Sequence, residues 1–345
     1  MNDPRPHPFR PRLPARLVTV AADRIGQRID NFLLLQLKSL PRPLVYKLIR
    51  SGQVRVNGRR VNVAYKLCAA DVVRIPPLCS DQKEDAGQTI SPLFIQRLEA
   101  AIVYEDQDLL VIDKPAGIAC HGGSGITSGV IEGLRALRAP QWLELVHRLD
   151  RDTSGVLLIA KKRRALTELH ALLRDHAASG QFKKVYLTLL VGRMPPGLMQ
   201  VAAPLETVVR SGGERHARVA ESGKASLSSF RLLERRAGCS LCEVTILTGR
   251  THQIRAHAAH IGFPIAGDEK YGDAQTNQFL RQQAGLRHLF LHASHVAFAL
   301  DQGRQPYVLH APLPPELASA YDRLLGATLR SDGLNNGAVA SSKSV

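Results

Sequence analysis

The sequence predicts an α+β protein with a small N-terminal domain and a larger second domain. Apolar residues between positions 29 and 49 recur at the spacing of two helices, one after the other. Short apolar or alternating runs, such as Val156–Ala160 and 243–247, indicate strands. The 345 residues, 44% of them hydrophobic, are enough for two domains that bury apolar cores.

The small domain is expected over residues 24–78. Its two helices each carry apolar residues on one face, namely Ile29, Phe32, Leu33 and Leu37, then Leu44, Val45, Leu48 and Ile49. Gly52 ends the second helix. The pair Asn57-Gly58 between two alternating segments, 53–56 and 59–63, predicts a hairpin, and 71–76 predicts a further strand.

Flanking segments complete the expected organisation. Residues 1–23 are expected to be a flexible basic tail, and the polar stretch 79–98 a linker. The larger domain is expected over 99–328. A tail rich in Gly, Asn, Ser and Ala, residues 329–345, is expected to be disordered.

The net charge of +16, with a pI near 10.0, indicates a polyanionic partner, either a nucleic acid or an anionic membrane surface. No window holds the ~20 consecutive apolar residues that a membrane-spanning helix needs. Residues 1–16 lack the apolar centre of a secretory signal, and their prolines oppose the amphipathic helix of a transit peptide. We therefore expect a cytoplasmic protein that binds nucleic acid rather than membrane.

The small domain is itself strongly basic. Within it, Asp30 and Asp71 are the only acidic residues. A solvated surface would also carry cations, but phosphate contacts better explain such an imbalance. The segments 28–33, 48–52, 54–58 and 71–75 resemble an S4 RNA-binding domain. On this basis we expect RNA contacts from Arg28, Lys47, Arg50, Arg55, Arg59 and Arg60.

The larger domain contains an unusual loop, His147-Arg-Leu-Asp-Arg-Asp-Thr-Ser-Gly155, directly before the strand 156–160. Asp150 stands between Arg148 and Arg151. Neighbouring cations can lower a carboxyl pKa by about 1–3 units from roughly 3.9. Such a carboxylate suits a nucleophile or an electrostatic stabiliser, although a surface ion pair ahead of a core strand would have the same charge pattern.

Other motifs argue against a metal or a nucleotide cofactor. The glycine-rich loop 121–129 lacks the Gly-Lys-Ser/Thr ending of a phosphate-binding loop. Cys239 and Cys242 lie three apart on an expected strand, so they face opposite sides, and no second pair completes a zinc site. His257 and His260 fall on an expected helix without a ligating carboxylate, which favours RNA contact or helix packing.

The loop 147–155 resembles the signature of the pseudouridine synthases that modify large-subunit ribosomal RNA, in particular their RluA/RluC branch. Three further stretches are similar to motifs of that family, namely 113–117, 183–192, and 247–257 with 267–272. The resemblance implies a catalytic fold with a mixed, largely antiparallel sheet. It also implies Asp150, Tyr186 and Arg255 as catalytic residues, with Arg250 as a less favoured alternative partner of Asp150.

The family reaction breaks the N1–C1′ bond of a uridine and rejoins the base through C5, with no cofactor. Asp150 would stabilise or attack C1′, or aid loss of the C2′ proton. Tyr186, otherwise an ordinary half-buried strand tyrosine, would stack on uracil. Arg148 would fill the space of the extruded base, and Arg151, Arg250 and His252 would contact RNA.

The resemblance thus predicts a 23S ribosomal RNA pseudouridine synthase, an isomerase that acts as a monomer. Transfer RNA is the alternative substrate. A non-catalytic S4-type ribosome-assembly protein would share the charge and the small domain, but has no need for Asp150, Tyr186 and Arg255 together. A polybasic membrane-surface protein has less support, since aromatic content is 5% and no lipid-anchor motif is present.

Overall fold

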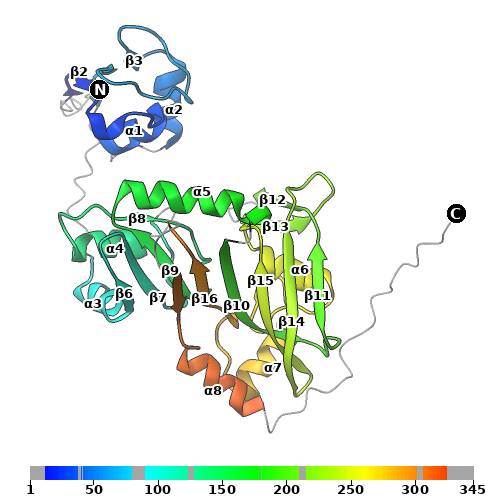
Figure 1. The fold of residues 1–345 in the computed structure, drawn as a ribbon. Helices are drawn as coiled ribbons and strands as arrows, with labels where there is room; N and C mark the ends of the chain where they lie inside the picture. The colour runs from blue at the N-terminus through cyan, green and yellow to red at the C-terminus, as the bar shows by residue number, and fades with distance from the viewer. Residues whose placement is uncertain are drawn as a thin grey trace, which may run out of the picture. The chain divides into compact units, whose positions relative to one another are not determined.

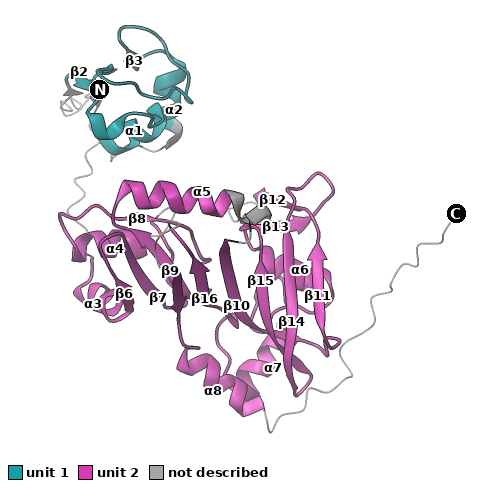
Figure 2. Ribbon diagram, in the orientation of Figure 1, with its two compact units in different colours: residues 1–89 teal, residues 90–345 magenta. Residues whose placement is uncertain are grey.

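The chain divides into two compact units, Met1–Thr89 (unit 1) and Ile90–Val345 (unit 2), coloured separately in Figure 2. The computed structural model describes residues 12–37, 40, 42–79, 90–122, 128–179, 181–209, 215–300 and 306–324. Residues 1–11 of the expected N-terminal tail and all of the expected C-terminal tail lie outside the described residues. Among those described, no helix combines the length and apolar content needed to cross a membrane.

Unit 1 packs two helices and a short sheet around one core. The helices are α1 (Ile29–Gln36) and α2 (Arg42–Arg50), as the apolar spacing predicts. The three-stranded sheet has the order β2 (Arg16–Thr19), β4 (Val72–Ile75), β3 (Arg55–Val56). A 3-10 helix (Ala22–Arg24) and the pair β1 (Arg12–Leu13) with β5 (Leu78–Cys79) complete the unit. The core includes Ile29, Phe32, Leu33, Val45, Ile49 and Val73.

One expectation for unit 1 is wrong, and a second is confirmed only in part. The segment 16–19, expected in the tail, forms β2, which runs antiparallel to β4, and the next residue, Val20, is buried. The hairpin turn at Asn57-Gly58 forms with both residues at positive φ, and Val56 and Arg59 exchange backbone hydrogen bonds across it, but no strand continues over 60–63. The side chain of Asn57 instead bonds to Asp71 and to the backbone N–H of Val72, which holds the turn against β4.

Unit 2 is built on a ten-stranded sheet, drawn across the lower ribbon of Figure 1. Along the sheet the order is β11 (Leu198–Ala202), β14 (Leu227–Arg236), β15 (Cys239–Ile246), β10 (Phe182–Val191), β16 (Leu291–Phe298), β9 (Ser154–Ala160), β7 (Leu109–Lys114), β6 (Ile102–Glu105). β8 (Glu144–Leu145) pairs with β9, and β17 (Tyr307–His310) with β16. Among the described pairings only β16 with β9 is parallel, which confirms the mixed, largely antiparallel sheet.

Alternate residues of the central strands enter two different cores, one on each face of the sheet. Leu157 and Ile159 of β9 belong to one core, whereas Val156 and Leu158 belong to the other. The second core also takes in Leu169 of α5 (Arg163–Ser179), the long helix at the top of unit 2 in Figure 1. Because both faces are covered, β9 is fully buried and its sequence is continuously apolar.

The remaining helices complete the first core. They are α3 (Pro92–Ala100), α4 (Val130–Leu137), α6 (Gln253–His260), α7 (Ala274–Ala284) and α8 (Pro315–Arg323). The expectation of a linker over 79–98 is wrong in part, because α3 occupies its last residues. Its Leu98 is fully buried and lies so close to Gly133 of α4 that a Cβ there would meet the leucine at 2.3 Å. A separate hairpin, β12 (Leu205–Val209) with β13 (Arg215–Val219), adjoins α6.

Candidate active site

The loop before β9 is held in place by hydrogen bonds to its backbone carbonyls. Lys114, which is completely buried, donates hydrogen bonds to the carbonyls of Pro115, Ile118 and Arg151 at 2.8–3.0 Å. The N–H of Gly117 donates to the same Arg151 carbonyl at 2.9 Å. The motifs 113–117 and 147–155 therefore meet, and together they fix the backbone on which Asp150 stands.

Gly155 explains why the signature loop ends in glycine. Its φ is +107°, and a Cβ at this position would lie 2.2 Å from the carbonyl oxygen of Ala293. β9 and β16 approach here as parallel neighbours, with Ser154 opposite His292 and bonded to its Nδ1 at 2.9 Å. A larger residue would push the two strands apart directly beneath the loop.

A cavity of about 560 Å³ opens beside this loop and brings the sequence-predicted catalytic residues together. Its walls come from the loop 147–153, from α5, from β10 and from the segment 246–255. Asp150, Tyr186 and Arg255 all line it. Three motifs that are far apart in the sequence thus meet at one hollow.

Arg255 contacts Asp150, but its tighter partner is another carboxylate. Nη1 of Arg255 lies 3.5 Å from Oδ2 of Asp150, whereas Nε and Nη2 each donate to Asp268 at 2.7 Å. The Asp268 side chain is fully buried and also accepts the N–H groups of Lys270 and Tyr271. Burial alone would raise the pKa of Asp268, but the hydrogen bonds and charge of Arg255 outweigh it and lower the pKa.

His252, expected to contact RNA, is placed beside the candidate nucleophile. Its Nε2 lies 3.9 Å from Oδ2 of Asp150, and its side chain is only 10% exposed. Nδ1 lies 2.9 Å from the hydroxyl of Tyr271. The Tyr271 ring also lies under the guanidinium of Arg255, 5.2 Å from Cζ to the ring centroid. Tyr271 therefore touches both groups that face Asp150.

Tyr186 and Lys184 form the β10 side of the cavity. Burial, together with the charge of Asp150, raises the pKa of Tyr186, so the hydroxyl stays protonated at neutral pH. Burial lowers the pKa of Lys184 to about 8. The wall facing Asp150 thus offers a protonated phenol and an amine that is easily deprotonated.

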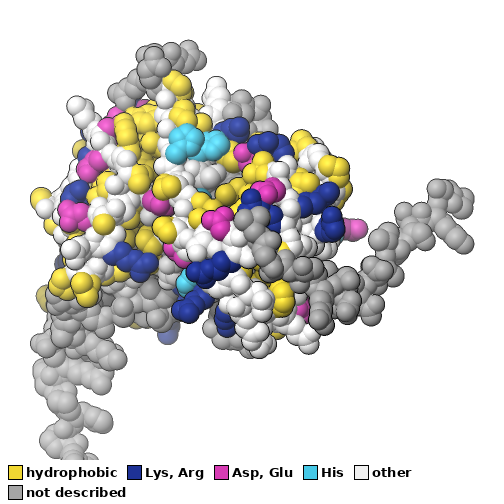
Figure 3. Space-filling view, turned by 90° about the horizontal axis from the view of Figure 1, so that it is seen from below, with side chains coloured by type: hydrophobic (Ala, Val, Ile, Leu, Met, Phe, Trp, Pro, Cys, Tyr) yellow, Lys and Arg dark blue, Asp and Glu magenta, His cyan; other side chains and the backbone are white. Residues whose placement is uncertain are grey.

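The arginines expected to contact RNA near the site divide into two groups. Arg148 and Arg250 are exposed and line the cavity. Arg151 is absent from the cavity wall; it is exposed and pairs with Asp152 at 3.1 Å. Figure 3 shows a face of unit 2 where basic and acidic side chains stand side by side among apolar ones, so that face has no uniform charge.

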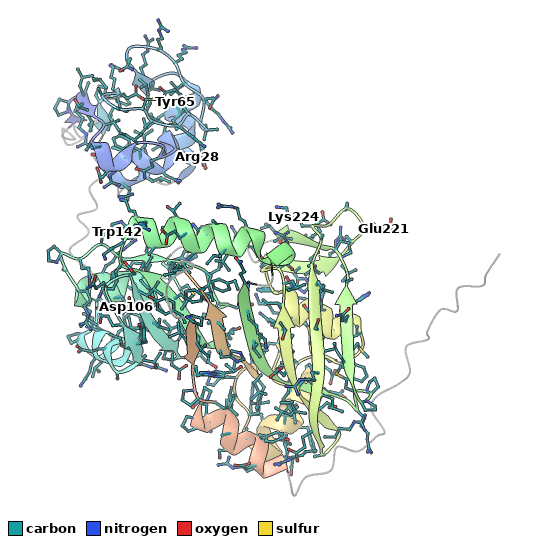
Figure 4. The ribbon with its side chains drawn as sticks, in the orientation of Figure 1. Arg28, Tyr65, Asp106, Trp142, Glu221 and Lys224 are labelled. Atoms are coloured by element: carbon teal, nitrogen blue, oxygen red, sulfur yellow. The ribbon has the colours of Figure 1, made fainter. Side chains whose placement is uncertain are left out.

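In unit 1 both central carboxylates are turned inward. Asp30 and Asp71 are each 4% exposed. Asp30 accepts two hydrogen bonds from Arg28, and Asp71 accepts from Asn57 and from Tyr65, so Arg28 is less free for RNA than expected (Figure 4 labels Arg28 and Tyr65). The other expected RNA contacts are all exposed, namely Lys47, Arg50, Arg55, Arg59 and Arg60.

Sequence reasoning missed several residues of the site. Asp268 and Tyr271 lie in the segment 267–272, which resembles a motif of the family. The sequence of this segment does not by itself indicate what either residue does. Lys184 likewise stands out in the sequence only as part of a strand. The available signal was a carboxylate and a tyrosine in a short Gly-bounded segment after the helix that bears Arg255.

Comparison with known proteins gives a consistent result along most of the chain. Residues 108–260 match the RNA pseudouridylate synthase family model, and 27–73 match the S4 domain. The chain is 46% identical over 313 residues to ribosomal large subunit pseudouridine synthase C of Pasteurella multocida, covering 90% of this chain and 93% of that protein. The Escherichia coli protein of the same name is 45% identical over 317 residues, covering 90% and 97%.

A solved structure shows the same fold. Human RNA pseudouridylate synthase domain containing 4 superposes with a TM-score of 0.55 at 24% identity, over 67% of this chain and 95% of that one. The family model and the sequence relatives agree, and the chain belongs to the RNA pseudouridylate synthase family, with an S4 domain at its N-terminal side.

Proposed function

We propose that this protein isomerises specific uridines of large-subunit (23S) ribosomal RNA to pseudouridine, as a monomer in the cytoplasm and without a cofactor. One observation carries the proposal. Asp150, Tyr186 and Arg255 line a single cavity, in a chain that aligns over 90% of its length with relatives named for this substrate. The exposed cations of unit 1 supply the matching affinity for RNA.

In the proposed reaction the N1–C1′ bond breaks and its electron pair stays with the uracil, while a carboxylate oxygen of Asp150 bonds to C1′. The detached uracil turns against Tyr186. C5 then attacks C1′ and releases the carboxylate; the proton on C5 is lost and N1 gains one, so substrate and product are isomers. Arg255, with Nη1 at 3.5 Å from Oδ2, orients Asp150. The protonated Tyr186 hydroxyl donates to the uracil rather than accepting its proton.

Release of tritium from RNA labelled at C5 of uridine tests the reaction. We expect release from large-subunit RNA and no comparable release from transfer RNA, with the same rate in EDTA as in its absence. Release from transfer RNA alone would show that transfer RNA, and not ribosomal RNA, is the substrate. Tight binding to ribosomal RNA without release from either RNA would instead favour a non-catalytic assembly factor.

The S4 domain is expected to add affinity through phosphate contacts. We expect replacement of its exposed cations by glutamine to weaken RNA binding. The plot of log binding constant against log salt concentration should also become less steep, by about 0.7–0.9 in slope for each phosphate that the variant no longer neutralises. The variant carries Lys47→Gln, Arg50→Gln, Arg55→Gln and Arg59→Gln. Binding is measured by titration with labelled RNA at several salt concentrations.

A matched control removes the same number of charges from unit 2. The control replaces four exposed arginines of unit 2 by glutamine. Each of them pairs with a carboxylate, and they are Arg164, Arg218, Arg231 and Arg281. The control should keep most of the wild-type salt slope. If the slope decreases equally in both variants, the affinity comes from net charge and not from the S4 surface.

A further inference from the structure

The hydroxyl of Tyr271 lies between a backbone donor and an imidazole. Its oxygen accepts the N–H of Ala217 at 2.7 Å and lies 2.9 Å from Nδ1 of His252. Burial raises the pKa of Tyr271 to about 12, so the hydroxyl keeps its proton at neutral pH. Among the described residues, Nδ1 of His252 is the one acceptor within reach of that proton.

We expect the imidazole of His252 to be neutral at neutral pH. Burial lowers its pKa to about 4, with Asp150 and Asp268 raising it and Arg255 and Lys270 lowering it. A neutral imidazole has one N–H and one acceptor nitrogen. If Nδ1 accepts from Tyr271, the proton must sit on Nε2, the nitrogen that faces Asp150.

The contacts to Asp150 converge on one oxygen. His252 Nε2 and Arg255 Nη1 both approach Oδ2, at 3.9 and 3.5 Å. The Asp150 side chain lines the cavity and is 24% exposed. Both donor nitrogens therefore lie on the Oδ2 side of the carboxylate, at or just beyond hydrogen-bond length.

We propose that Tyr271 is a positioning residue: its hydroxyl fixes His252 as the Nε2–H tautomer, and His252 with Arg255 then holds Oδ2 of Asp150 so that Oδ1 reacts. The kinetic part of this inference rests on the proposed isomerase activity. The tautomer does not, because it is a property of the free protein. A wrong tautomer would turn a lone pair toward the carboxylate, and the two would repel.

The direct test is the ¹⁵N spectrum of the histidine rings in the full-length protein, with His252→Gln used to assign the His252 signals. We expect a protonated Nε2 and an unprotonated Nδ1 at neutral pH. In Tyr271→Phe, which keeps the ring against Arg255 and against His216 (4.3 Å between centroids), the proton should spread to both nitrogens or move to Nδ1. Protonation of Nδ1 in the wild type, or an unchanged spectrum in Tyr271→Phe, overturns the proposal.

Kinetics separate positioning from a general structural role. Tyr271→Phe should lower the single-turnover rate about tenfold with RNA affinity unchanged. His252→Gln should lose less than His252→Ala, because the glutamine amide can still donate to Oδ2. Adding Tyr271→Phe to His252→Ala should cost nothing further. If the two substitutions combine additively, Tyr271 does not act through His252 and the proposal fails, while tritium release by the wild type would leave the isomerase function intact.

Discussion

Asp150→Asn is expected to abolish tritium release, lowering the single-turnover rate by roughly 10⁴-fold or more, as loss of a nucleophile does elsewhere. Asparagine keeps the shape of the side chain but has no charge and cannot bond to C1′. The fold should survive, because Arg255 keeps its bidentate pair with Asp268 at 2.7 Å when Asp150 is neutral. RNA affinity, measured by filter binding, should be kept or slightly increased.

Asp152→Asn is the matched control for this experiment. Asp152 lies two residues away in the same loop, where it pairs with Arg151 at the surface. Exposed ion pairs contribute little, so we expect activity within about fivefold of wild type. Equal activity of the Asp150→Asn and Asp152→Asn variants would remove Asp150 from the chemistry.

The largest stability effect is expected at Asp268. Asp268→Asn removes the charge that balances a guanidinium whose side chain is only 5% exposed. Removing one partner of a buried ion pair costs about 3–5 kcal/mol, and we expect a loss of this size in the free energy of unfolding of unit 2. Urea unfolding followed by fluorescence of Trp142, a residue of unit 2 and the only tryptophan of the chain, measures it.

Glu269→Gln provides the comparison, since Glu269 is next in sequence, 79% exposed and paired loosely with Arg281 at 3.5 Å. It should change the unfolding free energy by less than about 0.5 kcal/mol. A loss below about 1 kcal/mol in Asp268→Asn would show that Arg255 finds sufficient compensation elsewhere, with Asp150 as the nearest carboxylate.

The same residue gives a pH dependence of defined sign. Because the folded-state pKa of Asp268 is lowered, its contribution to stability is complete above the unfolded value of about 3.9. That contribution is lost as the pH falls through the lower folded pKa. Wild type should therefore lose stability below about pH 4 more steeply than Asp268→Asn, which has no proton to take up at this position.

Much of the fold could be predicted because its central strands are covered on both faces, which gives β7 and β9 continuous apolar sequences. Segments at the margins of the two units were harder to predict from the sequence. β2 has no buried side chain of its own and lies next to a Pro- and Arg-rich stretch, and α3 is a nine-residue helix whose Leu98 alone is fully buried. Neither has enough periodicity to stand out from a tail or a linker.

The candidate site was likewise predictable from the sequence only in part. Motif resemblance identified Asp150, Tyr186 and Arg255, and the structure brings them to one cavity. No pattern in the sequence indicated that Arg255 would bind Asp268 more tightly than Asp150, or that the His252 side chain would be only 10% exposed and beside Asp150. Which of several carboxylates a guanidinium selects depends on how α6 and the segment after it pack, and this is decided by tertiary contacts.

The position of β16 has a consequence for biosynthesis. This strand is synthesised after β9 and β10, yet it lies between them in the sheet, and its Ala293 contacts Gly155 beneath the loop that carries Asp150. Until the ribosome has released it, the nascent chain has two half-sheets with open edges and an unsupported Asp150 loop. Sheet closure over such sequence separation is slow, so we expect the Asp150 loop to reach its final geometry only after β16 has joined the sheet.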